Sequence, residues 1–581
     1  MMKKLGTLLL VALLATMNFV YSQSNDYLLI VGKDTVTKEE FLRTYQKNSS
    51  LEKATQKDLR EYLDLYTNFK LKVMDGEAHQ VDTSANFKRE LNSYRNQSAQ
   101  QYLVDKEVTE ELIEEAYDHA KYDVRASHIL ISCKSTEPSD TLAAYKKIMD
   151  IRKKLINKEM SFADAAVKYS DDPSAKEREG RGGKKLPGNN GDLGYFTVFN
   201  MIYPFEVAVY NTPVGQISMP VRTSFGYHLI YVSDKIPAVE SISISQIYIA
   251  DSLAKEGKMT NETKKKIEEI QKKLKAKNSF EDLVMAYSDD KGTATEAKKG
   301  EVMAFAPQRR PGDFVKTCLS LKSGEVSAPV STHDGWFIIK LNEIKKVEIT
   351  DEYKYSLKNR IQRDNRSFKS KESLVEKLKK EYKFKDSGSA AALDFFGKNI
   401  PQEYMQSSKI ELEELDGIKK LKPMFTFADQ QVTALDYAKY IRRFQGISNI
   451  QDMRKFVEEK YPFFVNETIL KYENDHLEDK YPDFKSLVEE YHDGMVLYEI
   501  TSSEVWLKAV KDTIGLENFY ETVKHKYPVS KSDPTPKHFD EVKSAVITEY
   551  QDYLEGKWLE ALRAKYPVKV NEKVFDSILK K

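Results

Sequence analysis

Short apolar runs alternate with helical patterns in the first half of this chain. The runs at 124–131 and 221–232 are rich in β-branched and aromatic residues, which predicts strands, and each run contains a histidine. Between them, apolar residues recur at three- and four-residue intervals, and Ser161 is placed to cap a helix. A further helix is expected from about Tyr203. This order of elements predicts a small α+β domain over 123–237.

A second copy of the same pattern follows at 238–347. The motif Ser-Phe-x-Asp, followed by Tyr-Ser-Asp-Asp, occurs at 161–172 and again at 279–290. A second pair of matching segments begins at Gly215 and at Gly324. Self-similarity of this kind indicates a tandem duplication.

The two copies differ at their histidines. The matching segments place Gln246 opposite His128, Phe337 opposite His228, Arg310 opposite Met201, Asp290 opposite Asp172 and Thr332 opposite Thr223. The second copy therefore keeps the architecture and loses both histidines, so we expect any chemistry of these residues in the first copy only. Because buried arginine is rare, Arg310 also indicates that its position faces a surface or a pocket.

Both end regions are predicted to be mainly helical. In 23–122, large apolar residues at helical spacing form either a buried face or a groove for unfolded peptide: Leu59, Tyr62, Leu63, Tyr66 and Phe69. Residues 348–581 are rich in Lys, Glu and Tyr, with scattered Gly and Pro. A strand–turn–capped-helix pattern at 426–437 resembles the one at 30–41, which indicates similar modules in the two end regions.

The amino terminus is typical of an export signal. Two lysines precede an apolar stretch over 5–15, and a tolerable cleavage site ends at Ser22, so 1–22 is expected to be a cleaved signal peptide. The apolar stretch is shorter than the roughly 20 residues that a membrane span requires. No later segment is apolar enough to span a membrane, so the mature protein is expected to be exported without a span.

Composition and spacing narrow the classes of function. The 91 basic and 90 acidic residues nearly cancel, which gives no support to nucleic acid as a partner. Cys133 and Cys318 occupy non-equivalent positions of the two copies, so separate thiols are favoured over a disulfide. The histidines lack a neighbouring third ligand, and the segment at Gly180 lacks the spacing of a phosphate-binding loop, so neither a metal nor another cofactor is expected.

The motifs of the first copy, taken in order, resemble those of the parvulin peptidyl-prolyl isomerases. They are Ala126-Ser-His-Ile-Leu-Ile, Tyr-Ser-Asp-Asp172, Gly-Asp-Leu-Gly-Tyr-Phe196, Met201-x-x-x-Phe-Glu and Phe-Gly-Tyr-His228-Leu-Ile. The resemblance implies a multidomain protein with two tandem α+β parvulin units, each a small antiparallel sheet with surrounding helices, flanked by mainly α-helical regions. Two such units behind a signal peptide are also similar to periplasmic chaperones, which implies a periplasmic location.

The resemblance also implies roles for residues of the first copy. His128 and His228 would lie beneath the active site, with Asp172 and Thr223 as the other polar members of the catalytic set. Phe225 would line the site near the histidines. The pocket for the proline ring would be formed by Leu193, Met201 and Phe205. Met201 and Phe205 are four residues apart, and this spacing predicts that they present one apolar face of a helix. From the residues alone, hydrogen-bonded core histidines and a turn-capping aspartate stay open as alternatives, and an orienting role is favoured over proton transfer.

Isomerisation of an X–Pro bond needs no nucleophile or metal, because no covalent bond is broken. The rotation barrier is about 18–20 kcal/mol, and an apolar slot with polar groups that fit the twisted amide can lower it. The leading hypothesis is an exported isomerase and chaperone whose clients are unfolded or proline-containing polypeptides, in particular envelope proteins. The alternatives are an isomerase-inactive holdase that binds unfolded envelope proteins and an envelope assembly scaffold with fixed partners.

Overall fold

The computed structural model of this protein describes residues 27–133, 138–180, 185–401, 404, 411–445 and 452–579. They form two compact units. The first combines the described residues up to Tyr102 with those from Lys471 onward, and the second contains Leu103–Leu470. The predicted C-terminal region 348–581 thus contributes to both units. The signal peptide predicted at 1–22 lies outside the described residues and stays a prediction.

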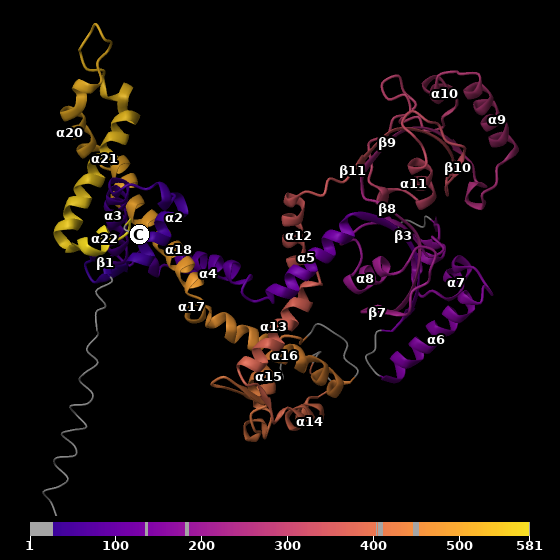
Figure 1. Cartoon of the computed structure of the whole chain (residues 1–581), viewed down its shortest axis with the longest axis horizontal. Coiled ribbons are helices and arrows are strands. Elements are labelled where there is room, and N and C mark those ends of the chain that lie inside the picture. Colours follow the sequence, from indigo (N-terminus) through magenta and orange to yellow (C-terminus); the bar gives the residue numbers. More distant parts are fainter. Residues whose placement is uncertain are drawn as a thin grey trace, which may run out of the picture. The chain divides into compact units, whose positions relative to one another are not determined.

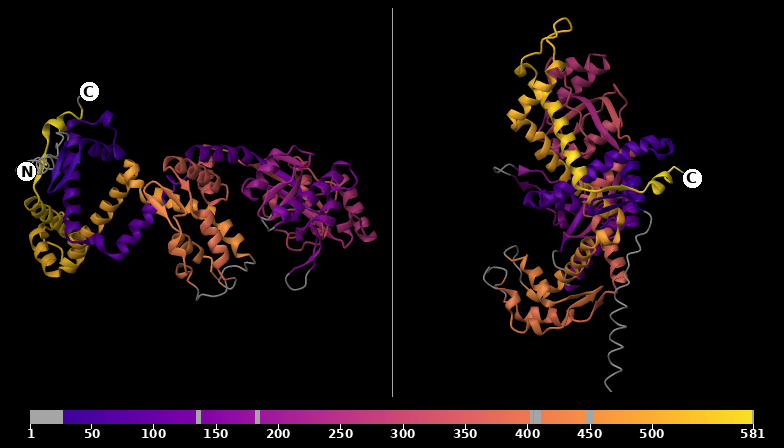
Figure 2. Two further views of the ribbon diagram at one scale, coloured as in Figure 1. Left: turned by 90° about the horizontal axis from the view of Figure 1, so that it is seen from below. Right: turned by 90° about the vertical axis from the view of Figure 1, so that its left-hand side faces the viewer.

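A three-stranded sheet joins the two ends of the described chain in the first unit. β1 (Tyr27–Val31) is the central strand and pairs antiparallel with β2 (Asp34–Thr37) and with β15 (Val568–Val570). In Figures 1 and 2 the yellow C-terminal elements accordingly lie beside the indigo N-terminal ones. The longer helices of this unit are α2 (Lys38–Asn48), α3 (Gln56–Ala78), α4 (Ala85–Ala99), α18 (Pro482–Thr501), α20 (Thr513–Val523) and α21 (Phe539–Lys565), with the short α17 (Leu477–Lys480), α19 (Leu507–Lys511) and α22 (Glu572–Asp576) between and after them.

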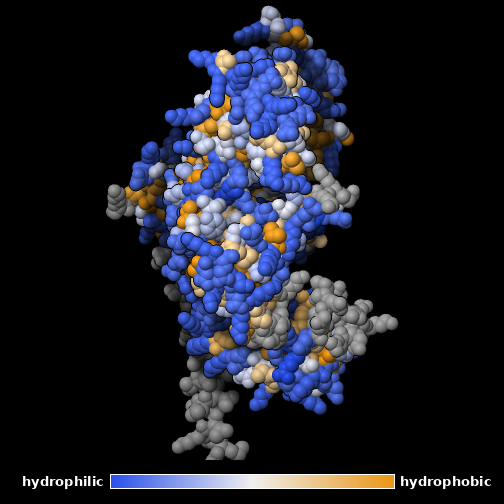
Figure 3. Space-filling model, turned by 90° about the vertical axis from the view of Figure 1, so that its right-hand side faces the viewer, coloured by the Kyte–Doolittle hydropathy of each residue, from blue (hydrophilic) through white to orange (hydrophobic). Residues whose placement is uncertain are grey.

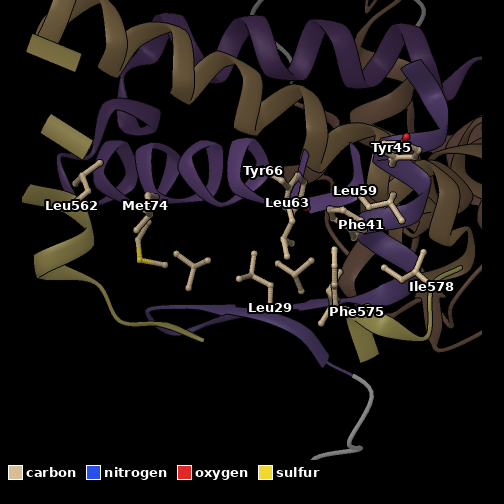
Figure 4. Close-up of a cluster of buried hydrophobic side chains, with 14 residues drawn as sticks. Leu29, Phe41, Tyr45, Leu59, Leu63, Tyr66, Met74, Leu562, Phe575 and Ile578 are labelled. Carbon is tan, nitrogen blue, oxygen red and sulfur yellow. The ribbon is translucent and has the colours of Figure 1, made fainter. Parts of the chain in front are cut away.

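The core of the first unit lies between this sheet and its helices. Figure 4 shows Leu63 and Met74 of α3 pointing toward the sheet, and Leu29 of β1 and Phe575 of α22 lie close to each other. The aromatic stripe predicted on α3 is part of this core, since Leu59, Leu63 and Tyr66 are buried and Tyr62 and Phe69 pack against them. Its interpretation as a buried face is therefore confirmed.

Residues 122–237 form the first α+β domain, with a four-stranded antiparallel sheet of order β6-β3-β8-β7. Its strands and helices are β3 (Tyr122–Ser132), α6 (Pro138–Ile156), α7 (Phe162–Tyr169), β4 (Arg178–Glu179), β5 (Lys185–Leu186), β6 (Asp192–Phe196), α8 (Tyr203–Asn211), β7 (Val221–Thr223) and β8 (Gly226–Pro237). Ser161 caps α7 as predicted, because its Oγ accepts the backbone N–H of Asp164. The run at 221–232 was predicted as one strand, which is wrong: a turn before Gly226 makes it a hairpin of β7 and β8.

The second copy repeats this arrangement with a sheet of order β10-β11-β9. Its elements are β9 (Val239–Ala250), α9 (Asn261–Lys275), α10 (Phe280–Tyr287), α11 (Gly312–Leu319), β10 (Val330–Ser331) and β11 (Gly335–Lys346). Tyr248 pairs with Phe337 as Leu130 pairs with His228 in the first domain, so the registers are equivalent. The predicted fold class is confirmed: two tandem α+β domains with small antiparallel sheets lie between mainly helical regions.

The rest of the second unit is mainly helical. It contains α5 (Lys106–Ala120), α12 (Asp351–Arg363), α13 (Ser367–Glu381), α14 (Ser389–Asn399), α15 (Ala434–Arg442) and most of α16 (Met453–Asp475), with the short strands β12 (Lys385–Asp386), β13 (Phe425–Phe427) and β14 (Gln430–Val432). The pattern predicted at 426–437 is confirmed, because the β13–β14 hairpin leads into α15 with Thr433 as its N-cap. Thr37 caps α2 after β1 and β2 in the same way.

The two cysteines are buried in different domains. Cys133 packs with α6 and α7 in the first domain, and Cys318 lies on α11 in the core of the second. No disulfide joins them, which agrees with the expectation of separate thiols. Burial raises the pKa of the Cys318 thiol to about 12, so this thiol is chemically inert at neutral pH.

Hydrophilic residues dominate the surface that Figure 3 shows, and hydrophobic ones form small, scattered groups there. This distribution fits a chain in which 31% of residues are charged. Among the described residues, no helix combines the length and the apolar character that crossing a membrane requires.

Candidate active site

Both histidines lie on one face of the sheet in the first domain. Side chains alternate between the two faces along a strand. Ile129 of β3 and Leu229 of β8 pack with α6 and α7 on one face, and Ile230 of β8 packs with α8 on the other. His128 and His228 are on the α8 face, where they approach each other.

The acidic turn after α7 is fixed to strand β3. Ser170 Oγ accepts the N–H of Leu130 at 3.1 Å, and Asp171 donates its N–H to Leu130 O at 2.8 Å. Asp171 also accepts the N–H of Ser132 at 2.8 Å. These bonds extend the edge of the strand with side-chain partners, and they bring the next residue, Asp172, against His128. The local sequence Tyr-Ser-Asp-Asp is therefore the device that positions the carboxylate.

Four polar side chains form a continuous hydrogen-bonded row. Asp172 Oδ2 lies 2.8 Å from His128 Nε2, and the Nδ1 atoms of His128 and His228 are 3.3 Å apart. Thr223 Oγ1 lies 2.8 Å from His228 Nε2. His128, His228 and Thr223 are buried, whereas the Asp172 side chain is partly exposed.

The network determines where the protons lie. The backbone N–H of Phe225 donates to Thr223 Oγ1, so the hydroxyl can donate to His228 Nε2. His228 then carries its proton on Nδ1 and donates it to His128 Nδ1, and His128 donates from Nε2 to the Asp172 carboxylate. Every bond points the same way, and every ring nitrogen is occupied. Neither imidazole has a nitrogen left to bind a metal ion.

Burial keeps both imidazoles neutral. It lowers the pKa of His128, although Asp172 offsets part of the effect. For His228, burial and the adjacent His128 lower the pKa to about 4. Partial burial alone would raise the pKa of Asp172, but hydrogen bonds from Ser174 and the contact with His128 outweigh it, so its pKa is lowered. At neutral pH the site thus contains one carboxylate and two uncharged rings.

An apolar group adjoins the polar row. The Phe205 ring meets both imidazoles edge to face, with centroids 5.7 Å from His128 and 5.3 Å from His228. Phe205 is buried, while Leu193 and Met201 of the same cluster are only partly buried. Phe225, beside Thr223, is 57% exposed. The arrangement therefore offers an apolar surface to an incoming chain next to the buried polar groups.

One detail of the predicted slot is wrong. Met201 and Phe205 were expected on one helix, four residues apart, but α8 begins at Tyr203 with Pro204 in its first turn. Proline favours the first turn of a helix, so the helix starts there. Met201 lies in the loop before the helix, and it still joins the cluster of Phe205.

Two glycines allow the close packing around the histidines. Gly191 has φ +85°, and a Cβ there would lie 2.8 Å from His128 O, whose backbone N–H donates to Gly191 O at 2.9 Å. Gly226 has φ +148°, and a Cβ there would lie 2.1 Å from Ile131 O. Only glycine fits these two positions.

The second domain repeats the scaffold of the site without its chemistry. Gln246 Nε2 donates to Asp290 Oδ2 at 3.2 Å, as His128 does to Asp172 in the first domain. Phe337 stands where His228 would, and it can neither donate nor accept. Gln246 Oε1 consequently has no hydrogen-bond partner among the described residues, although Gln246 is buried.

An arginine lies over the aromatic rings of the second domain. The guanidinium of Arg310 lies 5.2 Å from the ring centroid of Phe305 and 5.4 Å from that of Phe314, the counterpart of Phe205. Tyr195 of the first domain packs against the same cluster. Arg310 is partly buried, which agrees with the expectation that its position faces a surface or a pocket. The apolar surface that the first domain exposes is therefore covered in the second.

Three polar residues near the site, Glu206, His119 and Arg366, were not predicted from the sequence. Glu206 is fully buried and contacts His119 of α5 and Arg366 at the start of α13. Glu206 directly follows Phe205, so its place in the motif was a usable signal. Arg366 had no local signal, because its partner lies 160 positions away.

A group of side chains in the first unit has the geometry to ligate a cation. Ligand atoms of Glu77, His492 and Asp493 lie within 4.8 Å of one another. Lys70 already pairs with Asp493 at 3.0 Å. An ion-pair network therefore accounts for this group.

The two α+β domains match one known domain family. Residues 113–236 and residues 247–343 each match the PPIC-type peptidyl-prolyl isomerase (PPIase) domain. The protein therefore contains two tandem PPIase domains of the parvulin type, and the resemblance seen in the motifs is confirmed.

The individual proteins most informative for comparison are chaperones and foldases. The chain is 28% identical to chaperone SurA of Shewanella denitrificans over 234 residues, which cover 40% of this chain and 50% of that protein. It is 37% identical to foldase protein PrsA of Geobacillus kaustophilus over 131 residues, which cover 22% of this chain and 38% of that protein. The chain thus spans about half, or less, of the length of these relatives.

Solved structures resemble parts of the chain. The crystal structure of the peptidylprolyl isomerase PrsA from Bacillus anthracis is 24% identical with a TM-score of 0.17, and the match covers 34% of this chain and 75% of that one. The solution structure of TbPIN1 is 27% identical with a TM-score of 0.16, and the match covers 19% of this chain and 97% of that one.

Proposed function

We propose that this protein is an exported peptidyl-prolyl cis/trans isomerase and chaperone, in which the first parvulin domain isomerises X–Pro bonds. The observation that carries the proposal is the placement of a neutral histidine pair beside an apolar group in which Phe205 is buried and Leu193 and Met201 are partly exposed. Asp172 and Thr223 hold the two rings, and Phe205 packs edge to face on both. Both the polar row and the apolar group are present in this domain.

The chemistry needs only differential stabilisation of the twisted amide. Phe205, with Leu193 and Met201, would hold the proline ring, and Phe225 would flank the bound chain. The buried polar row offers fixed dipoles and no free positive charge, so it does not stabilise the planar, charge-separated amide. A thousandfold acceleration requires about 4 kcal/mol, which contacts of this kind can supply. The histidines then serve to orient the site and do not need to transfer protons.

The test exchanges one residue between the two domains. Met201→Arg copies the second domain into the first, and Arg310→Met is the reciprocal control in the same chain. Exchange NMR measures the rate at which a proline-containing peptide isomerises. The full chain should raise this rate above that of the uncatalysed reaction. Met201→Arg should lower kcat/KM at least tenfold, and Arg310→Met should leave it unchanged. A parent chain that binds the peptide without accelerating its isomerisation would leave only the holdase.

On this proposal, the second domain serves as a peptide-binding module or as a spacer and does not catalyse isomerisation. It lacks both histidines, Arg310 covers its aromatic group, and Gln246 has lost one hydrogen-bond partner. Retention of the Ser-Asp turn there is explained by folding, since Ser288 and Asp289 bond to Tyr248 of β9 as Ser170 and Asp171 bond to β3.

The helical end regions, on this proposal, hold unfolded polypeptide clients, in particular envelope proteins in the periplasm. The names of the relatives, chaperone SurA and foldase protein PrsA, support this part of the proposal. In the first unit, Leu507, Val510 and Ile514 expose 49%, 57% and 73% of their surface, which unfolded apolar segments can contact. Replacing all three with serine should weaken the suppression of aggregation of an unfolded outer-membrane protein and leave peptide isomerisation unchanged. Equal suppression by the variant would contradict this assignment.

A further inference from the structure

The loop that carries Met201 is anchored on its other side by two helices that lie outside residues 122–237, namely α5 before them and α12 after the second domain. Val198, fully buried, packs with Leu112 of α5 and Leu357 of α12, and Phe199 and Tyr203 pack on the same cluster. Figure 1 shows α5 and α12 next to each other and beside the first domain. Residues on one side of this short loop thus line the proline slot, while residues on the other side belong to a helical core.

The loop contains a strained residue. Phe199 has φ +64°, a left-handed conformation that a bulky side chain adopts only under constraint. Its N–H donates to Glu206 Oε2 at 2.7 Å. Its ring is contacted by two guanidinium groups, at 4.4 Å from Arg360 and 4.0 Å from Arg366. These contacts hold the backbone two residues before Met201.

Arg366 is the centre of this clamp. It is 1% exposed, and it donates to Glu206 Oε2 at 2.9 Å and to Asp364 Oδ1 at 2.8 Å. His119 Nδ1 lies 3.1 Å from the other oxygen of Glu206. Glu206 lies on α8. Its carboxylate thus links α5, through His119, to the start of α13, through Arg366.

A fully buried arginine is costly and rare. Arg366 Nη1 has no hydrogen-bond partner in the described part of the chain, so the residue is not fully compensated by hydrogen bonds. An apolar side chain of similar volume would fill the space over Phe199 and Tyr203 at lower cost. The presence of a charged side chain at position 366 is therefore explained better by its contacts with Glu206 and Phe199 than by a gain in folding stability.

We propose that Arg366 is a positioning residue for the proline slot: through Glu206 and Phe199 it fixes the loop that carries Met201, so the peptide affinity of the first parvulin domain depends on the helices that follow the second. The inference rests on the proposed function, because it concerns the same slot. It also means that the parvulin segment alone lacks part of its own site.

The experiment uses the full chain with Arg366→Met and, as a matched control, Arg363→Met, which removes an exposed arginine from the same turn of chain. Line-shape NMR of a proline peptide gives KM and kcat separately, and the methyl resonance of Met201 reports the peptide Kd without requiring turnover. Arg366→Met should raise KM and Kd about tenfold with kcat changed less than threefold, and should shift the Met201 methyl. Arg363→Met should change none of these.

A second variant separates positioning from the simple loss of a counter-charge. Arg366→Met combined with Glu206→Gln leaves no buried unpaired charge, and the glutamine oxygen can still accept the N–H of Phe199. This double variant should melt close to the parent and still show the tenfold weaker Kd. If its Kd returns to the parental value, or if a folded Arg366→Met chain binds within twofold of the parent, the inference is overturned. A parent chain that binds but does not isomerise refutes the proposed activity, and the Kd comparison still decides the role of Arg366.

Discussion

Acidification should lower the free energy of unfolding of the first parvulin domain, because His228 becomes protonated. Its pKa is lowered to about 4, against an ordinary value of 6.5. Between these values the unfolded chain binds a proton that the folded domain does not, so stability rises with pH across this window. The contribution is fully present above pH 6.5 and is lost as the pH falls toward 4. A shift of this size corresponds to about 3 kcal/mol.

The neighbours of His228 do not reverse this sign. The pKa of His128 is lowered as well, so its contribution is lost in the same direction as the pH falls. The lowered pKa of Asp172 stabilises the fold above the ordinary pKa of an aspartate, and that contribution is lost only at lower pH than the histidine window. Acid should therefore act first on the imidazoles.

The second domain supplies an internal control, because Gln246 and Phe337 replace the histidines in an equivalent sheet. Hydrogen exchange, corrected for the intrinsic effect of pH, should show the protection of β3 and β8 falling about a hundredfold between pH 6.5 and 4.5. The protection of β9 and β11 should change far less. Selective ¹³C labelling of the nine histidines, with His228→Phe for assignment, measures the titration directly. An NMR pKa of His228 at or above 6.5, or equal losses in both sheets, would refute the reasoning.

Three further substitutions test other parts of the structure. Gly226→Ala puts a Cβ 2.1 Å from Ile131 O, so it should destabilise the first domain by more than ~1 kcal/mol and lower the melting temperature. Thr223→Val removes the donor to His228 Nε2, which should cost about 1–3 kcal/mol in urea unfolding and reduce isomerase activity. An unchanged urea midpoint would contradict the network as described. Phe575→Ala should cost about 3–5 kcal/mol in the first unit and release the hydrogen-exchange protection of β1, while proline-peptide isomerisation stays at the parental rate.

The fold of the two domains could be predicted because its signals are local and repeated. Ser161 caps a helix in one copy, and Ser279 does so in the other, each by accepting an N–H three residues on. Alignment of the two copies then identified equivalent positions in the two domains, which patterns within either copy could not reveal. Gln246 contacts Asp290 in the structure as His128 contacts Asp172, which is the equivalence the alignment implied.

The parts that were missed depend on backbone conformation or on distant partners. The turn at Gly226 interrupts an otherwise uniform β pattern, because apolar periodicity does not report a positive φ. Met201 was placed on a helix since its spacing to Phe205 fits one, although Pro204 sets the start of α8. Arg366 lies in a sequence region rich in charged residues and has no distinguishing local pattern. Its burial depends on a segment that includes Glu206, which is 160 positions away in the sequence.

The pairing of β1 with β15 sets an order of events during biosynthesis. Leu29 pairs with Val570 across the sheet, so β1 cannot gain β15 as its neighbour until residues 568–570 have been synthesised. Closing so long a loop costs only a few kcal/mol more than closing a short one, since that cost grows with the logarithm of its length. The order of synthesis, and not the free energy of loop closure, therefore limits when this sheet is completed. Both parvulin domains can fold while the edge of β1 that pairs with β15 is still unpaired. A prematurely terminated chain would keep that edge uncovered, and a protease could recognise it there.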